Sequence, residues 1–409
     1  MTALLCVVLL ALSTWLAPVD PDTTEVLAPV WPQRAFEAAL GAKGVVVELD
    51  HDPRRLMSRQ LPMQGGRASV RTHAGLMLER LGDAANGVSV DAVLGEGPNA
   101  LIFDGVWIDQ ARQSDGKTLL FVSLREGEAY EIERTWMAYE PTRTEAVKGL
   151  AVIIPGTFGY PAELYEKWAD DLRSRGWSVL RLLSQPSRFT EHVLVRVDGD
   201  AADQGAVFAR RADDRTAECA YAVEHAARFL EGLDPRLAGK PRTLLGFSGG
   251  AILAPGVVAR EPQRYESVVL VAGGANAASI SIDSTFMKRF IRSVTFEFLG
   301  ENTDTDRQAF EAAYLGRATL DGYHAAMQFA DGARVLVIDG SFDQAVPFAS
   351  STLMVDRLAL GGVDPIRRTY PVNHVMLFMA LNDSLGQIND WIDGGELTLP
   401  PGQGDPNSP

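Results

Sequence analysis

The sequence has few of the residues that bind metals or build disulfide frameworks. Its 409 residues include two cysteines and six histidines, with no Cys-x-x-Cys pair and no Cys/His cluster. This scarcity excludes the common structural zinc motifs and a disulfide scaffold. Cys219 lies in an expected helix and is interpreted as a small buried apolar residue.

Positive charge is also in short supply. Lysine and arginine number 38 against 53 aspartate and glutamate residues, which gives a formal net charge of −15. Phosphate backbones would be repelled on average, so nucleic acid is not an expected partner. The charges are scattered rather than grouped in blocks, and a hydrophobic content of 46% is enough for a globular protein with a sizeable core.

The apolar segment at the N-terminus, Ala3–Ala17, falls short of the roughly 20 residues that a membrane-spanning helix needs. Its length suits the apolar region of a secretory signal, although no lysine or arginine precedes it and Pro18 follows it. We expect residues 1–17 to be an export signal or a membrane tether, and the protein to be exported or membrane-associated. A buried N-terminal helix in a cytoplasmic protein, or a misassigned start codon, is the alternative.

Residues 20–115 form an N-terminal extension of unassigned role. Within it, Lys43–Leu49 and Asn99–Ile108 have the apolar pattern of short strands, and no catalytic motif is found. From Lys117 onward the secondary structure can be predicted more clearly. Two strand-like runs joined at Arg125–Glu128 predict a hairpin.

Beyond this hairpin, short apolar runs alternate with segments of helical periodicity. A polar stretch to Arg215 precedes one such helix, whose apolar positions run from Cys219 to Leu233. The alternation predicts an α/β domain over residues 117–395, with a mostly parallel sheet flanked by helices, in preference to a two-layer α+β fold. The runs typical of buried strands are Gly149–Gly159, Trp177–Leu183, Arg242–Phe247, Ser267–Gly274 and Ala333–Gly340.

The segment 275–332 interrupts this alternation. A second helix is expected over Phe310–Ala330, after a first one with a single apolar stripe of Phe286, Met287, Phe290, Ile291, Val294 and Phe298. We interpret the segment as a helical cap that shapes a substrate pocket. A helical decoration packed on the sheet is the alternative. Residues 396–409 are rich in proline and glycine and are expected to be a disordered tail.

One serine stands between glycines in "GFSGG", Gly246–Gly250. A Gly-x-Ser-x-Gly match alone is a weak signal. Here it follows a strand and precedes the expected helix beginning near Ile252, which is the setting of a nucleophile elbow. The flanking glycines leave room for the neighbouring strand and helix, and the helix N-terminus favours negative charge at the reacting centre. Ser248 is therefore the predicted nucleophile.

A serine nucleophile needs a histidine base and an acid that orients the base. Only His324 and His374 follow Ser248, and His374 is favoured because it lies in a late loop before an apolar helix. His324 lies inside the expected insertion and is the lesser candidate, while His225, on the preceding helix, is interpreted as structural.

The acid is expected after a strand between the serine and the histidine. "DGSFDQAVP" supplies Asp339 and Asp343. Asp343 is favoured because it lies past the glycine turn and can reach the histidine loop, whereas Asp339 could cap that turn. Asp364 stays a minor candidate.

The oxyanion of an acyl-transfer reaction needs two backbone N–H donors. Gly249, directly after the nucleophile, is the first. The second is expected in the loop after the Gly149 strand, at Thr157 or alternatively Phe158. Pro155–Gly159 could also be a simple turn.

Together these features resemble the α/β-hydrolase fold superfamily, serine esterase- or lipase-like, over residues 117–395. The resemblance rests on "IIPGTFG", "GFSGG", "DGSFDQAVP" and "NHVMLF", and on the order of serine, acid and histidine. Many members have His-Gly in the oxyanion loop, whereas this chain has Pro155-Gly156.

The resemblance and the residues both lead to a carboxylic ester hydrolase acting through an acyl-enzyme on Ser248, with Asp343 and His374. We expect a small-molecule or lipid-like ester as substrate, and no metal or organic cofactor. A serine peptidase or amidase, and a non-catalytic binding protein on the same fold, are the alternatives. The acyl preference and the oligomeric state do not follow from the sequence.

Overall fold

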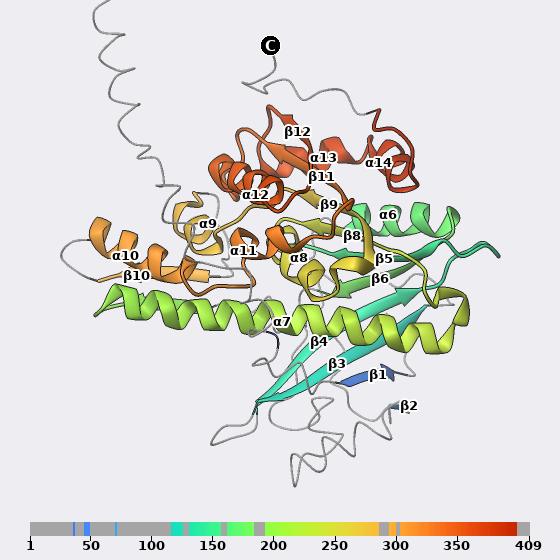
Figure 1. Ribbon diagram of the computed structural model, residues 1–409, viewed down its shortest axis with the longest axis horizontal. Coiled ribbons are helices and arrows are strands. Elements are labelled where there is room, and N and C mark those ends of the chain that lie inside the picture. The colour runs from blue at the N-terminus through green and yellow to red at the C-terminus, as the bar shows by residue number, and fades with distance from the viewer. Residues whose placement is uncertain are drawn as a thin grey trace, which may run out of the picture.

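The structure is a computed structural model (Figure 1). It describes residue 36 and residues 45–49, 70–71, 116–125, 131–156, 162–183, 193–285, 294–299 and 303–398. The expected segment 1–17 and the expected strand Asn99–Ile108 lie outside the described residues, as does most of the extension 20–115.

A sheet of ten strands forms the centre of the molecule, in the order β12-β11-β9-β8-β5-β6-β4-β3-β1-β2. From β6 to β12 the neighbouring strands are parallel, whereas β4 runs antiparallel to β3 and β6, and β1 runs antiparallel to β2 and β3. The strands are β1 (Val45–Leu49), β2 (Val70–Arg71), β3 (Lys117–Arg125), β4 (Glu131–Glu140), β5 (Gly149–Ile154), β6 (Trp177–Leu183), β8 (Arg242–Phe247), β9 (Tyr265–Val271), β11 (Arg334–Gly340) and β12 (Ile366–Tyr370).

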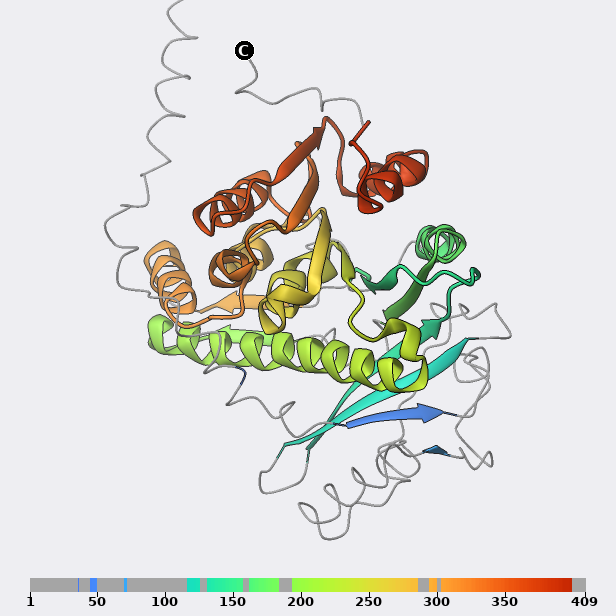
Figure 2. The same ribbon diagram turned by 45° about the vertical axis from the view of Figure 1, so that its right-hand side comes forward.

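Helices cover both faces of this sheet (Figure 2). One face packs against α7 (Ala201–Leu233), α8 (Gly249–Arg260) and α12 (Phe348–Leu360), and the other against α6 (Ala162–Ser174), α13 (His374–Leu381) and α14 (Leu385–Ile392). The predicted mostly parallel α/β sheet flanked by helices is confirmed.

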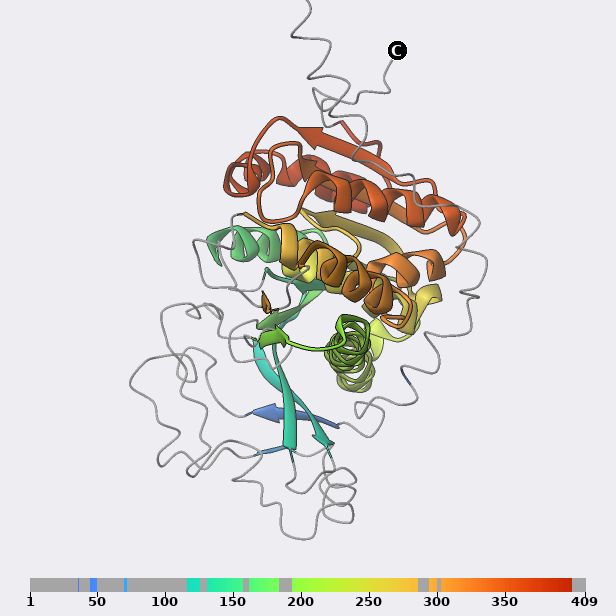
Figure 3. The same cartoon turned by 90° about the vertical axis from the view of Figure 1, so that its left-hand side faces the viewer.

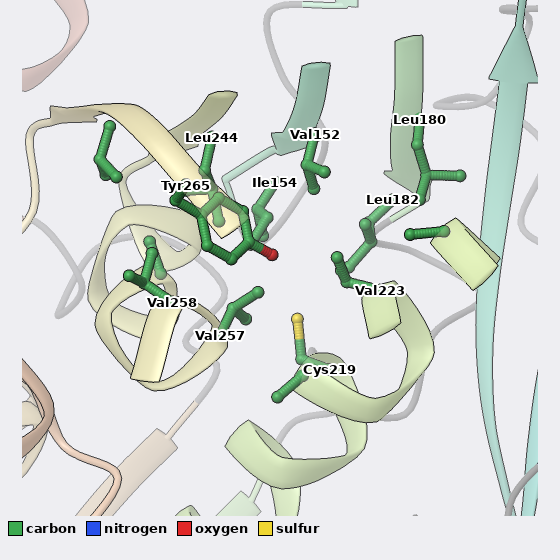
Figure 4. Packing of buried hydrophobic residues seen from close by; sticks show 14 of the residues in the cluster. Val152, Ile154, Leu180, Leu182, Cys219, Val223, Leu244, Val257, Val258 and Tyr265 are labelled. Atoms are coloured by element: carbon green, nitrogen blue, oxygen red, sulfur yellow. The ribbon is translucent and has the colours of Figure 1, made fainter. Parts of the chain in front are cut away.

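The central strands are apolar throughout because both of their faces are buried. In β5, Val152 and Ile154 point to the α7 and α8 side, whereas Ala151 and Ile153 point to the α6 side. Figure 4 shows the first of these layers, where Cys219 of α7 lies among aliphatic side chains of the sheet. Cys219 is fully buried, as the sequence predicted.

Helix α7 is 33 residues long and begins well before the predicted apolar stripe. The Asp200 carboxylate accepts hydrogen bonds from the N–H groups of Ala202 and Asp203 and so caps its first turn. The polar stretch before Arg215 therefore belongs to the helix. Its alanine and arginine residues are strong helix formers. In Figure 3, α7 is seen end-on.

The N-terminal half of α7 packs against a second, smaller sheet. Here β7 (Val193–Val197) and β10 (Val294–Phe298) form a parallel pair. Phe208 of α7 contacts Phe296 and Phe310 edge-on or tilted, with ring centroids 5.0 and 6.0 Å away. Val294–Phe298 was predicted as part of a helix and is a strand, because pairing with β7 overrides the helical spacing. The rest of that stripe lies outside the described residues.

The remaining part of the insertion is helical in pieces: α9 (Ala277–Asp283), α10 (Thr303–Leu315), α11 (Gly322–Ala325) and the 3₁₀ turn η7 (Ala326–Gln328). The helix expected over Phe310–Ala330 is broken between Leu315 and Gly322, and Asp321 lies at the end of this break. Its carboxylate accepts from the N–H groups of Asn276, Ala277 and Tyr323, and from the hydroxyl of Tyr314. Asp321 therefore begins α11 and binds the chain that leaves β9.

The N-terminal extension is anchored to the main domain through Phe36. The Phe36 side chain is buried, and its carbonyl oxygen accepts a hydrogen bond of 2.6 Å from the Tyr221 hydroxyl. The Arg260 guanidinium lies 5.3 Å from the Phe36 ring centroid. Among the described residues, no helix combines the length and apolar character needed to cross a bilayer.

Candidate active site

Ser248 sits at the sharp turn between β8 and α8. Its φ is 51° and its ψ is −119°, a conformation that L-residues rarely adopt and that costs on the order of 1–3 kcal/mol. Its N–H donates to the carbonyl oxygen of Val271 at 2.8 Å, which ties the turn to the neighbouring strand β9. This strained backbone holds the side chain away from the sheet.

The glycines around Ser248 are required by close backbone packing. A Cβ on Gly246 would lie 2.8 Å from the Cα of Ala251, and a Cβ on Gly250 would collide with the carbonyl oxygen of Ile154. Gly156, after β5, is also close, since a Cβ there would lie 3.3 Å from the Ser248 Cβ. The elbow therefore fits directly against the carboxyl end of β5.

His374 lies far from Ser248 in the chain, and its imidazole contacts the serine side chain. Its Nε2 lies 3.0 Å from the Ser248 Oγ. It is the first residue of α13, whose N-terminus is capped by the Asn373 side chain accepting from the Met376 N–H. The Phe378 ring lies edge-on to the imidazole, with centroids 5.2 Å apart. The side chain of His374 is nearly buried.

Asp343 lies in the turn after β11 and completes a hydrogen-bonded chain. Its Oδ2 is 2.6 Å from the His374 Nδ1. Its Oδ1 accepts from the N–H groups of Ala345 and Val346 at 2.7 and 2.9 Å. With Nδ1 donating to the carboxylate, Nε2 is the acceptor that faces Ser248.

The lesser candidates are engaged elsewhere. The His324 Nε2 lies 2.7 Å from the Leu315 carbonyl oxygen, and burial lowers the pKa of His324. The Asp339 carboxylate accepts from the Ser351 hydroxyl at 2.5 Å and pairs with Arg367. Asp364 is exposed. The structure therefore joins Ser248 to His374 and Asp343, and not to these three.

His225, interpreted from sequence as structural, lies on α7 beside the Tyr221 ring, with centroids 6.1 Å apart. Burial lowers the pKa of His225. It lies on a different element from all three members of the hydrogen-bonded chain.

Of the two predicted oxyanion donors, the structure describes Gly249 and does not describe Thr157. Gly249 is the first residue of α8, where backbone N–H groups point out of the helix end. Thr157 lies outside the described residues, as does the alternative Phe158. The N–H of Gly156 donates to the Tyr165 hydroxyl at 3.1 Å.

Two residues near the site were not assigned a role from sequence. Asn373 could have been found, because asparagine before an apolar helix is a typical N-cap. Tyr165 could not, because it was one apolar position of a helical stripe and its contact with Gly156 depends on the packing of α6. In the described part of the chain, no group of three or more His, Cys, Asp or Glu side chains is arranged to hold a metal ion.

Exposed apolar side chains lie close to Asp343 and His374 in the chain. Phe342 precedes Asp343 and is 65% exposed, and its N–H donates to the carbonyl oxygen of Val372. Val375, Met376 and Met379 are 45–63% exposed on α13.

No protein-family model and no curated protein matches the sequence. Among solved structures, an acylaminoacyl peptidase from Pyrococcus horikoshii is similar over 72% of this chain, at 11% identity and a TM-score of 0.44, and this chain covers 44% of it. An esterase from Pyrococcus furiosus is similar over 67% of the chain, with 90% of its own length covered, at 13% identity and a TM-score of 0.41. A cold-adapted esterase from an Arctic intertidal metagenomic library is similar over 68% of this chain and 95% of its own length, at 16% identity and a TM-score of 0.40.

The chain has the α/β-hydrolase fold. The strand order from β3 to β12, the turn with positive φ after β8, and the chain order of serine, aspartate and histidine all agree with that fold. Because one fold hosts many activities, the chemistry has to be argued from the site itself.

Proposed function

We propose that the protein is a serine hydrolase that cleaves a carboxylic ester through an acyl-enzyme on Ser248. The observation that carries the proposal is the continuous hydrogen-bonded chain from the Ser248 Oγ through His374 to Asp343. A serine hydroxyl is unreactive near neutral pH without such a base. The strained turn that presents Ser248 supports the same role.

In the first half-reaction, the Ser248 Oγ attacks the ester carbonyl carbon and its proton passes to the His374 Nε2. The carbonyl oxygen becomes an oxyanion beside the N-terminus of α8, where the Gly249 N–H is the proposed donor. When the intermediate collapses, the ester C–O bond breaks and His374 gives its proton to the leaving alkoxide. Asp343 holds the imidazole in the required tautomer and stabilises its charged form.

In the second half-reaction, His374 takes a proton from water, and the resulting hydroxide attacks the acyl carbon. The bond to the Ser248 Oγ breaks, and the serine recovers its proton from His374. The acid product leaves, and the enzyme returns to its starting state. All of these proton transfers use groups of the chain and the solvent.

The exposed apolar side chains that neighbour Asp343 and His374 in the chain support an ester with an apolar acyl or alcohol part. Phe342, Val375, Met376 and Met379 include no charged group. Burying an apolar substrate group against them contributes roughly 25 cal/mol per Å² of surface removed from water.

A panel of p-nitrophenyl esters from acetate to dodecanoate tests this proposal on wild type and Ser248→Ala. We expect turnover by wild type that rises with chain length before it levels off, and loss of turnover in the variant. A fluorophosphonate probe should label wild type at Ser248, forming an Oγ–P bond with release of fluoride.

An amide panel run in parallel separates the alternatives. Hydrolysis of aminoacyl p-nitroanilides without hydrolysis of any ester would favour a peptidase or amidase and would contradict the ester proposal. Absence of both turnover and labelling in the folded protein would favour a non-catalytic binding protein.

A further inference from the structure

Tyr165 connects the loop after β5 to the nucleophile elbow. It lies in the first turn of α6, with a side chain that is 1% exposed. Its hydroxyl oxygen accepts from the Gly156 N–H at 3.1 Å. Burial raises the pKa of Tyr165, so the phenol stays neutral and its oxygen remains an acceptor for this N–H.

Gly156 is the described residue of this loop that lies against the nucleophile. A Cβ on it would be 3.3 Å from the Ser248 Cβ and 3.6 Å from the Tyr165 hydroxyl. The Tyr165 oxygen therefore holds the backbone of Gly156 on the side of Ser248. A small shift of this backbone would change the space beside the serine, because even a single added carbon on Gly156 would crowd the Ser248 Cβ.

The Tyr165 ring makes a second contact with the elbow. It packs edge-on against Phe247, the residue before Ser248, with ring centroids 5.0 Å apart. Phe247 in turn lies 6.4 Å from the Phe378 ring, which packs on the His374 imidazole. One side chain of α6 thus touches the β5 loop by its hydroxyl and the β8 turn by its ring.

We propose that Tyr165 is a positioning residue, which fixes the backbone of Gly156 beside Ser248 so that the space next to the nucleophile is preorganised. This inference rests on the proposed ester hydrolysis. Tyr165 touches neither the substrate nor the reacting atoms, and it acts through Gly156. The space beside Ser248 has to fit the tetrahedral intermediate, so loss of the Tyr165 hydroxyl should slow turnover more than it weakens substrate binding.

The test is Tyr165→Phe, which keeps the ring on Phe247 and removes the acceptor for Gly156. We expect kcat for the p-nitrophenyl ester that wild type hydrolyses fastest to fall about tenfold, with KM nearly unchanged, because a displaced Gly156 backbone would fit the transition state less well than the bound substrate. Affinity for a phenylboronic acid, which forms a tetrahedral adduct on Ser248, should fall by a similar factor.

Tyr221→Phe is the matched control. Tyr221 is also buried, and its hydroxyl also bonds to backbone, at the Phe36 carbonyl oxygen, but it lies on α7 away from the elbow. Both variants should lose thermal stability, and only Tyr165→Phe should lose kcat and boronate affinity. If wild type is active, and folded Tyr165→Phe has the same kcat and boronate affinity as wild type, the inference about Tyr165 is overturned and the proposed function stands. A wild type without turnover or labelling would overturn the proposed function and this inference with it.

Discussion

Gly250 in the first turn of α8 packs directly onto the carbonyl oxygen of Ile154, the last residue of β5. A side chain at this position would collide with backbone rather than with a flexible group. The turn that carries Ser248 and the strand end that leads to Gly156 therefore have a fixed separation. Both sides of the proposed site depend on this single contact.

Gly250→Ala should disrupt this contact and lower both the melting temperature and the activity. The matched control is Gly232→Ala, which lies within α7 with no heavy atom within 4 Å of the added Cβ. Alanine should stabilise that helix position by about 0.5–1 kcal/mol. Thermal denaturation and ester turnover of the two variants check the prediction, and equal behaviour of both would contradict it.

His374→Ala should lose nearly as much activity as Ser248→Ala, because the hydrogen-bonded residues act as a unit. The expected fall in kcat is roughly 10⁴- to 10⁶-fold for each. Steady-state kinetics on a p-nitrophenyl ester measure it, with His324→Ala as a control that keeps the activity. Near wild-type turnover in His374→Ala would refute the assignment of the base.

Asp343→Asn and Asp339→Asn should separate activity from stability. Asp343 bonds to the His374 Nδ1, and its replacement by asparagine should lower kcat by roughly 10⁴-fold with a small change in stability. Asp339 bonds to Ser351 and Arg367, so its replacement should cost about 1–3 kcal/mol of unfolding free energy and leave turnover largely intact. Kinetics and urea denaturation of both variants measure the two effects, and the reverse pattern would identify Asp339 as the acid.

Asp213 should make the folding stability depend on pH near neutrality. Burial raises the pKa of Asp213 to about 7, against hydrogen bonds from Thr319 and Leu320 that lower it. A carboxyl with a raised pKa favours the folded state when protonated, and this contribution is lost as pH rises from about 4 through about 7. The melting temperature of wild type minus that of Asp213→Asn should therefore fall across this range.

Asp234→Asn is the control for this measurement. The hydrogen bond from Arg236 lowers the pKa of Asp234, so its contribution to stability is lost only as pH falls below the usual range of a carboxyl. The difference in melting temperature between wild type and this variant should stay flat from pH 5 to 8. A flat difference for Asp213→Asn as well would contradict the prediction for Asp213.

The elements around the candidate site could be predicted because local patterns specify them. Continuous apolar runs such as Gly149–Ile154 require a strand buried on both faces, and glycines around Ser248 require a tight turn. Asp343 and His374 follow the strands β11 and β12, and the parallel sheet brings the carboxyl ends of its strands to one edge.

The rest depends on contacts between distant segments. Val294–Phe298 has apolar residues at spacings that suit either a helix or a strand, and its partner β7 decides between them. The bond between Gly156 and Tyr165 depends on how α6 packs on the sheet. The bonds from Asn276 and Ala277 to the Asp321 carboxylate join segments about 45 residues apart, which the sequence does not reveal.

The β7/β10 pair limits which segments of this protein can be exchanged with those of other proteins. Each strand is the ladder partner of the other, yet β7 precedes the Ser248 turn in the chain and β10 follows it. Transplanting a segment with only one of these strands into another protein of this fold would leave an open strand edge, a typical start of aggregation. A chimera that keeps its solubility must exchange both strands together, along with the N-terminal half of α7 on which they pack.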